Sequence, residues 1–198
     1  DVTKYCSSNL KVVYLGESIT SLGKDAFRNC KNLQSIIIPE GVIDIGDNAF
    51  DGCNDMANIS FPRTLIHIGF NSFNETKWFN SQPEGIIYAG PVAYKYKGTV
   101  SPDSEIVIKD GTRIISDSLF MDCSGLKTII FPNSVISIGH HAFYHCNNLM
   151  SVTLPQSLEE IGNYAFDGCS NIYKVICNAL ICPVLKFNVF DNTIIHNT

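Results

Sequence analysis

The residue types that most often carry out chemistry are present, so their spacing is considered first. Eight cysteines could form disulfides or hold a metal, but no Cys-x-x-Cys pair occurs, which leaves a zinc ribbon or redox pair unsupported. His141 and His145 are four residues apart, the spacing of two metal ligands on one helix face, and His140 is adjacent. Only one short turn is expected there, so we predict a solvated rim and no metal site, with adventitious metal binding as the alternative.

The acidic residues are scattered, and no pair of them recurs at a spacing suited to acid/base catalysis. No nucleophile elbow, phosphate-binding loop or dinucleotide glycine fingerprint is present. We therefore predict that the chain is not an enzyme, has no catalytic residues and needs no cofactor.

The whole-chain composition narrows the class of protein further. The chain has 198 residues, a net charge of −5, 45% hydrophobic residues and only 17% charged residues. It is too apolar for a disordered chain and too acidic for a general electrostatic grip on nucleic acid or an anionic membrane. No apolar run reaches the roughly 18 residues that span a bilayer, so no membrane insertion is expected within this segment.

One motif recurs along the chain and organises it. Ile-Gly-x-x-Ala-Phe-x-x-Cys begins at Ile45, Ile138 and Ile161. Six phenylalanines fall at the same place in the motif, in two series spaced by 23 residues: Phe27, Phe50, Phe73 and Phe120, Phe143, Phe166. Since a 23-residue unit is too small to fold alone, we expect the units to stack and the phenylalanines to form a buried ladder.

Each unit also contains a block that is typical of a half-buried strand. The block reads Leu-x-x-Ile-x-Ile-Pro at Leu33 and recurs at Met56, Leu126 and Leu149 with small changes. Its proline ends the strand, and the motif's glycine fits a bend. Asp47, Asn48 and Ser118 resemble starts of a single helical or 3₁₀ turn that carries Ala-Phe inward.

Together the two blocks resemble the BspA-like, Treponema pallidum-type, branch of leucine-rich-repeat proteins. The resemblance implies an α/β fold: a right-handed solenoid with a parallel sheet on the concave side and short helical or 3₁₀ turns opposite. It also implies a bacterial cell-surface or secreted protein with a role in adhesion.

Most of the cysteines occupy one position of the repeat: Cys30, Cys53, Cys123, Cys146 and Cys169. This regularity favours a buried ladder of free thiols over disulfides. Cys177 and Cys182 lie outside the ladder, and a bridge between them is left open.

The 23-residue spacing of the repeats is interrupted once. We predict one leucine-rich-repeat domain over 1–198, with repeats at 1–77 and 105–198 and an irregular β-hairpin insert at 78–104. Both ends cut into a repeat, so we expect this to be a fragment of a longer protein.

Strand alternation predicts which side chains face outward and could contact a partner. On the sheet these binding candidates are Tyr14, Ser35, Ile37, Ser60, Ile130, Thr153 and Ile176. Tyr94 and Tyr96 in the insert are further candidates, unless their rings cover the edge left by the broken repeat. The alternative for the sheet is that these residues are present only because strands favour them.

The predicted function is that of a non-enzymatic surface or secreted protein that binds a protein partner, such as a host or matrix protein, with its oligomeric state open. A structural spacer within a larger surface protein and a glycan-binding accessory module are the alternatives.

Overall fold

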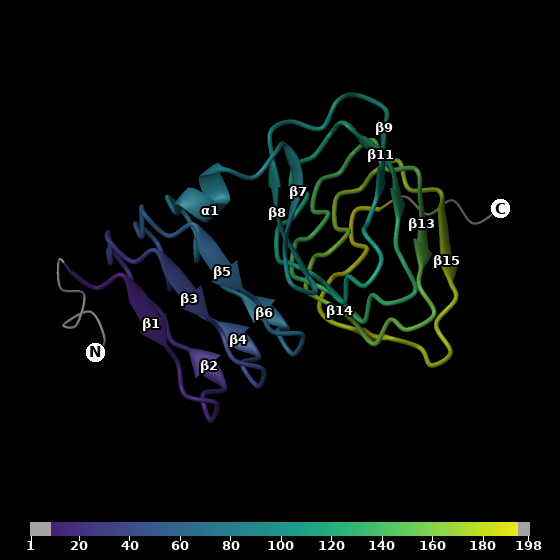
Figure 1. The fold of residues 1–198 in the computed structure, drawn as a ribbon. Helices are drawn as coiled ribbons and strands as arrows, with labels where there is room; N and C mark the ends of the chain where they lie inside the picture. The colour runs from purple at the N-terminus through teal and green to yellow at the C-terminus, as the bar shows by residue number, and fades with distance from the viewer. Residues whose placement is uncertain (1–8, 194–198) are drawn as a thin grey trace. The chain divides into compact units, whose positions relative to one another are not determined.

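The computed structural model describes residues 9–193, and the structural statements below concern these residues (Figure 1). The chain winds as a β-solenoid in which each regular coil contributes one longer strand and one two-residue strand. The longer strands are β1 (Val12–Tyr14), β3 (Ser35–Ile37), β5 (Asn58–Ser60), β9 (Ser104–Val107), β11 (Leu126–Ile130), β13 (Ser151–Leu154) and β15 (Lys174–Cys177). The short strands are β2 (Ser21–Leu22), β4 (Asp44–Ile45), β6 (His67–Ile68), β10 (Ile114–Ile115), β12 (Ser137–Ile138), β14 (Glu160–Ile161) and β16 (Val184–Leu185).

The strands of successive coils pair in parallel, in the register that the repeat predicts. Val13 pairs with Ile36, and Ile36 pairs with Ile59, so that equivalent residues stack along the sheet. The short strands form sheets of their own, with the orders β2-β4-β6 and β16-β14-β12-β10-β8-β7. The leucine-rich-repeat fold and its parallel sheets are therefore as predicted, while the handedness and the concave placement of the sheet stay predictions.

The described chain divides into two compact units. Unit 1 comprises residues 9–83 and 89–92, and unit 2 comprises residues 84–88 and 93–193. All three boundaries, at 83/84, 88/89 and 92/93, fall inside the predicted insert. The prediction that 1–198 forms one domain stays a prediction.

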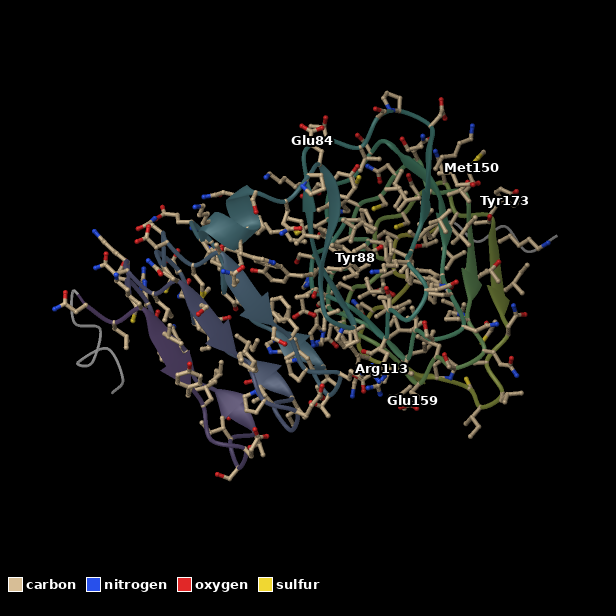
Figure 2. The ribbon with its side chains drawn as sticks, in the orientation of Figure 1. Glu84, Tyr88, Arg113, Met150, Glu159 and Tyr173 are labelled. Atoms are coloured by element: carbon tan, nitrogen blue, oxygen red, sulfur yellow. The ribbon has the colours of Figure 1, made fainter. Side chains whose placement is uncertain are left out.

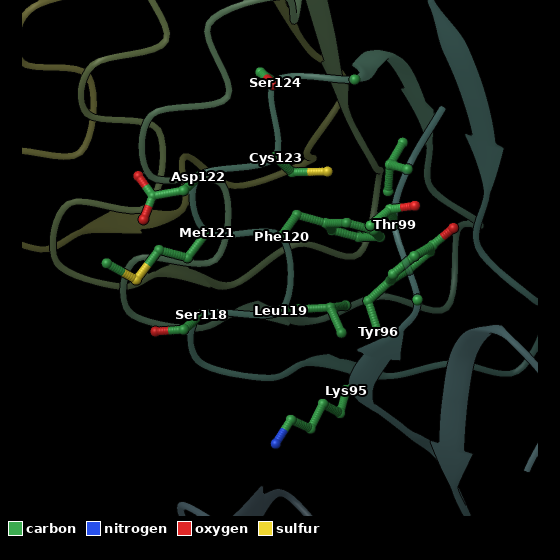
Figure 3. Close-up of a pocket in the computed structure, with 13 residues that line it drawn as sticks. Lys95, Tyr96, Thr99, Ser118, Leu119, Phe120, Met121, Asp122, Cys123 and Ser124 are labelled. Atoms are coloured by element: carbon green, nitrogen blue, oxygen red, sulfur yellow. The ribbon is translucent and has the colours of Figure 1, made fainter. Parts of the chain in front are cut away.

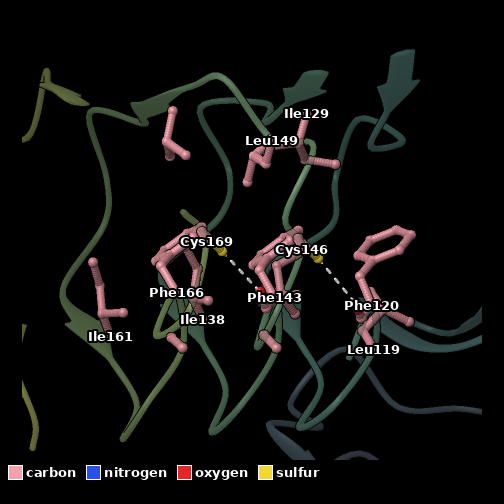
Figure 4. Packing of buried hydrophobic residues seen from close by; sticks show 14 of the residues in the cluster. Leu119, Phe120, Ile129, Ile138, Phe143, Cys146, Leu149, Ile161, Phe166 and Cys169 are labelled. Carbon is pink, nitrogen blue, oxygen red and sulfur yellow. Dashed lines mark hydrogen bonds between the residues drawn. The ribbon is translucent and has the colours of Figure 1, made fainter. Parts of the chain in front are cut away.

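The six predicted phenylalanines are buried and form a ladder in each unit. In unit 1 the ring of Phe50 stacks on those of Phe27 and Phe73, with centroids 5.3 Å apart in both pairs. In unit 2 the ring of Phe143 stacks on those of Phe120 and Phe166, at 5.4 Å and 4.9 Å (Figure 4). Each stacked pair joins two coils and removes one face of each ring from water, which is how units too small to fold alone become stable together.

The segments that carry Ala-Phe are turns, and the expected helical or 3₁₀ turns are absent from these corners in the described chain. Two residues of each corner, four apart, have left-handed backbone: Asp25 and Asn29, Asn48 and Gly52, Asn71 and Glu75, Ser118 and Asp122, His141 and His145, Tyr164 and Gly168, Asn188 and Asn192. A right-handed helix needs φ near −63°, so the start of a helix at Asn48 (φ 52°) or Ser118 (φ 55°) is wrong.

The left-handed residues let the corner bond both to itself and to the next coil. The N–H of Ala26 donates to Gly23 O within its own corner, at 3.2 Å. The next N–H, of Phe27, donates to Ala49 O of the following coil, at 2.7 Å. A helix would keep all of these bonds within one coil, whereas the alternation ties each coil to its neighbour.

The glycine of the Ile-Gly pair is required by the closeness of the coils. A Cβ atom added at Gly46 would lie 2.6 Å from Lys24 N, and one added at Gly162 would lie 2.6 Å from His140 N. Both contacts are with backbone, which cannot move aside. Glycine is therefore required at this position for a reason besides the bend: the backbone of the preceding coil leaves no room for a side chain.

The insert begins with the short helix α1 (Lys77–Asn80) and continues with β7 (Gly85–Ala89) and β8 (Val92–Lys97). Thr76 caps the helix, since its Oγ1 accepts a hydrogen bond from Phe79 N at 3.1 Å. β7 and β8 are neighbouring strands joined through Gly90 and Pro91, and β8 also neighbours β10. The antiparallel geometry of a hairpin stays a prediction.

Candidate binding surface

The outward side chains of the longer strands form one row on each unit. In unit 1, Tyr14 is 84% exposed and Ile37 is 59% exposed, and the two residues are paired across β1 and β3. Ser60 pairs with Ile37 and is exposed, while Ser35 is half-buried. The face in unit 1 is therefore apolar toward β1 and hydroxyl-bearing toward β5.

In unit 2 the equivalent row runs from β9 to β15. Val107 is 62% exposed and pairs with Ile130, which is 43% exposed. Thr153 is exposed and pairs with Ile176, which is also exposed. The strand alternation predicted from the sequence thus holds for this row, and its role in binding stays a prediction.

The insert tyrosines do not form an exposed patch. Tyr94 is only 7% exposed, and the ring of Tyr96 lies 5.6 Å from that of Phe120, at the first corner of the unit 2 ladder (Figure 3). Burial raises the pKa of the Tyr96 hydroxyl. The prediction that Tyr94 is exposed is wrong, because its side chain is buried, whereas Tyr96 is half-buried and its role in binding stays a prediction.

Trp78 has the matching role in unit 1. Its ring centroid lies 5.2 Å from those of Phe73 and Phe61, so it covers the last rung of that ladder. The Trp78 ring makes the van der Waals contacts with Phe73 that the phenylalanine of a following coil would otherwise make. In both units, therefore, the insert supplies an aromatic cover for a ladder.

The cysteine ladder is buried, and most of it is reduced. The thiols of Cys53, Cys146 and Cys169 each donate to the carbonyl of a phenylalanine 26 residues earlier, at 3.0 Å. Figure 4 shows the bonds of Cys146 and Cys169. Burial raises the pKa of the Cys53 thiol to about 12, and the hydrogen bond with the Cys169 thiol together with burial raises the pKa of Cys146. Thiols that remain protonated at neutral pH are poor nucleophiles, so this ladder is structural.

Cys30 is an exception to the prediction of free thiols. It is disulfide-bonded. Cys177 and Cys182 are free and exposed, so the bridge left open between them is not formed. The position of Cys30 in the repeat could not predict its oxidation, because all five cysteines at that position share the same Phe-x-x-Cys motif.

The histidines contact neighbouring coils. The ring of His141 stacks on that of Tyr164 with centroids 5.1 Å apart, and His145 Nδ1 lies 3.4 Å from Asp122 Oδ1. Within residues 9–193, no three His, Cys, Asp or Glu side chains are grouped so that they could hold a metal ion.

A further ladder was not anticipated from the sequence. The residue after the motif's glycine accepts a hydrogen bond from a backbone N–H of the next coil. Asp117 Oδ1 accepts from His140 N at 2.7 Å, His140 Nδ1 accepts from Asn163 N at 2.8 Å, and Asn163 Oδ1 accepts from Phe187 N at 3.0 Å. The sequence does place a hydrogen-bond acceptor at this position in successive repeats. The pattern is hard to recognise because the acceptors are of three types, Asp117, His140 and Asn163.

Hollows are present on the described surface of unit 2. One, of about 430 Å³, lies between the end of β8 and residues 118–125 (Figure 3). Another, of about 330 Å³, opens on the face of β11 and β13 and includes Ile130 and Thr153. Elsewhere on unit 2, Met150 and Tyr173 extend exposed side chains from adjacent coils (Figure 2). The outer face of unit 2 therefore combines a row of uncharged side chains, Val107, Ile130, Thr153 and Ile176, with a groove that includes Ile130 and Thr153.

Comparison with known proteins identifies the family. The BspA type leucine rich repeat region matches residues 3–87 and 92–198 in six copies. The chain belongs to this family. No curated protein matches the chain in sequence. The helical structure described in residues 9–193 includes nothing long and apolar enough to cross a bilayer.

Several solved structures resemble this BspA-type chain. A leucine rich repeat protein of T. pallidum is 26% identical, with 92% of this chain and 76% of that chain covered and a TM-score of 0.43. A leucine rich cell surface protein of Faecalibacterium prausnitzii is 22% identical, with 90% and 42% covered and a TM-score of 0.40. The pneumococcal vaccine antigen PcpA is 17% identical, with 92% and 66% covered and a TM-score of 0.46. This chain thus spans less than two thirds of the F. prausnitzii chain.

Proposed function

We propose that this BspA-type chain is a non-enzymatic module that binds a protein partner through the outer face of its longer strands, at the cell surface or outside the cell. The observation that carries the proposal is the row of exposed apolar side chains at equivalent places, Tyr14 and Ile37 in unit 1 and Val107, Ile130 and Ile176 in unit 2. Such residues have no role in the interior of the solenoid.

The arrangement of the row favours binding. Strand pairing holds Tyr14 beside Ile37 and Val107 beside Ile130 on a hydrogen-bonded sheet, so little conformational entropy is lost when a partner covers them. Ser60 and Thr153 add neutral hydrogen-bonding groups to the same face. Exposed charges on the same face of unit 2 are Glu105 and Lys174, which are opposite in sign, so the face has no excess of positive charge to attract a polyanion.

The location outside the cytosol is supported by Cys30. Disulfides persist in oxidising compartments and are rare in reducing ones. Adhesion to a host or matrix protein is the form of binding that the resemblance of the repeats suggests.

The proposal is tested by a binding screen of the 198-residue chain against extracellular matrix proteins, mucosal proteins and glycans. We expect a protein ligand whose affinity falls at least tenfold in Ile37→Ser or Ile130→Ser. Ile43→Ser is the control, since Ile43 is 44% exposed but lies outside the longer strands.

Three results would contradict the proposal. Failure to bind any protein would favour a spacer, and binding of a glycan alone would favour an accessory module. Equal losses in all three variants would show that the strand face is not the binding site.

A further inference from the structure

The parallel pairing of β9, β11, β13 and β15 is shortest between β11 and β13, while the β9/β11 pair has a register shift between Leu126 and Thr128. β13 and β15 pair at four successive positions, from Ser151↔Lys174 to Leu154↔Cys177. β9 and β11 stay paired as far as Val107↔Ile130. β11 and β13 pair only at Thr128↔Ser151, so the pair Ile130/Thr153 that the repeat requires is missing from the described sheet.

The interruption leaves backbone groups without the partners they have elsewhere. At the residue after the strand, Ile38 N donates to Ser60 O at 3.2 Å, and Ile108 N donates to Ile130 O at 2.9 Å. The equivalent bond, from Phe131 N to Thr153 O, is absent from the described backbone. Phe131 N and Thr153 O thus lack both the strand pairing and the hydrogen bond that their equivalents have at β3/β5 and β9/β11.

Phe131 accounts for the separation. The equivalent positions in other coils hold Ile38, Ile108 and Leu154, which are smaller. The ring of Phe131 packs edge-on against that of Phe143, with centroids 5.8 Å apart and an interplanar angle of 87°. The ring needs more room at the strand end than an aliphatic side chain, and the next coil cannot close over it.

The groove of about 330 Å³ lies at this junction. Its lining includes Ile130, Phe131 and Thr153, which flank the missing pair, and the side chains of Asn133 and Asn178 beyond the strand ends. None of the residues that line it is charged. It therefore combines open backbone groups, hydroxyl and amide side chains and apolar surface, without an ionic group.

We propose that this groove binds an extended, uncharged segment of a protein partner, which completes the interrupted hydrogen bonding of β11 and β13 with its own main chain. The inference rests on the proposed function, because it assumes a protein partner, and it assigns part of the recognition to one place. Open N–H and C=O groups along strands are matched by another extended chain, whose amides recur with the same spacing. The uncharged lining excludes a segment rich in Lys, Arg, Asp or Glu, since a buried charge there would have no counter-ion.

The test uses the peptide acetyl-Thr-Val-Thr-Val-Thr-amide, titrated into the ¹⁵N-labelled 198-residue chain and followed by amide chemical shifts. We expect saturable shifts at the amides of Phe131 and Thr153. The same peptide N-methylated at alternate amides lacks those donors and should bind at least tenfold more weakly.

A variant closes the junction. Phe131→Ile restores the type of residue found at Ile38 and Ile108, so it should slow hydrogen exchange at Thr153 and weaken peptide binding at least tenfold. Phe61→Ile is the matched control, because Phe61 holds the same position in unit 1 and packs on Phe73 in the same way, at 5.4 Å and 84°. The N-methylated peptide keeps the test decisive if Phe131→Ile fails to fold.

The outcomes separate this inference from the proposed function. Shifts elsewhere in the chain, equal binding by the N-methylated peptide, or unchanged binding by a folded Phe131→Ile variant would each overturn the groove as a peptide site. Shifts at Phe131 caused by the disaccharide chitobiose and not by the peptide would overturn the choice of ligand. In all of these cases, loss of binding of a whole protein partner in Ile37→Ser would still support the strand face.

Discussion

Phe143 has ring partners on both sides, and this makes it the residue whose loss should cost most. Truncating it to alanine leaves a cavity between Phe120 and Phe166 that the stacked coils cannot collapse to fill. We predict that Phe143→Ala lowers the free energy of unfolding by about 3–5 kcal/mol, measured by urea denaturation. Phe70→Ala is the control, since Phe70 is 74% exposed and should change stability by less than about 0.5 kcal/mol. Equal losses in the two variants would contradict the ladder.

The thiols should differ in reactivity according to burial. At pH 8 we predict that iodoacetamide modifies the exposed Cys177 and Cys182 in the folded protein and leaves Cys53 and Cys146 unmodified, as mass spectrometry would show. Modification of Cys53 without unfolding would contradict its burial.

The same burial makes stability depend on alkaline pH. In the unfolded chain Cys53 ionises near the ordinary pKa of a cysteine thiol, 9.0, whereas in the folded chain burial raises its pKa to about 12. Between these values the unfolded state loses a proton that the folded state keeps, so this thiol's contribution to stability falls as the pH rises above about 9. Denaturation of the Cys53→Ala variant should show a smaller loss over that range.

Gly168 combines two demands that only glycine meets. Its φ is +72°, and an added Cβ would lie 2.0 Å from Cδ2 of the His145 ring. Gly168→Ala should therefore cost more than the roughly 1–2 kcal/mol of left-handed backbone alone. Gly111→Ala isolates the backbone cost, because Gly111 has φ +83° and open space around its Cβ position. Thermal unfolding of the two variants measures the difference, and equal shifts would show that His145 simply moves aside.

At the scale of the elements, the acceptor ladder should contribute to the joining of coils. Asp117→Ala removes the acceptor of His140 N, and hydrogen bonds to charged groups contribute about 1.5–3 kcal/mol, less where they are exposed. We predict a loss of about 1 kcal/mol in urea denaturation. Asp110→Ala is the control, because Asp110 makes no hydrogen bond in the described structure and should have no effect.

The strands were predictable because the repeat places the same residue at the same point of every coil. The corners were not, because their left-handed positions hold Asp25, Ser118, His141 and Tyr164 in turn, and no shared residue type marks the conformation. The burial of Tyr94 was not predicted for a related reason. The insert occurs only once, so there is no repeated pattern from which its buried positions could be distinguished from its exposed ones. The interruption at Phe131 depends on the volume of one ring, to which a pattern of hydrophobic residues is insensitive.

At the scale of the whole molecule, unit 2 contains its own ladder and its own cover. Tyr96 lies against Phe120 at the first rung, and Phe190 stacks on Phe166 at the last, at 5.3 Å. A chain of residues 84–198 should therefore fold alone and unfold in one cooperative transition, measured by circular dichroism. A gradual, non-cooperative melt would show that unit 2 depends on unit 1.

The hydrogen bonds between coils have one further consequence. Each regular corner donates to the next coil through equivalent atoms, as Phe27 N does to Ala49 O and Phe120 N to Ala142 O. Removal or duplication of one complete coil in the gene would therefore join surfaces that already match. Gain or loss of one coil would change the length of the solenoid by about 4.8 Å, and it would require no new type of contact between coils.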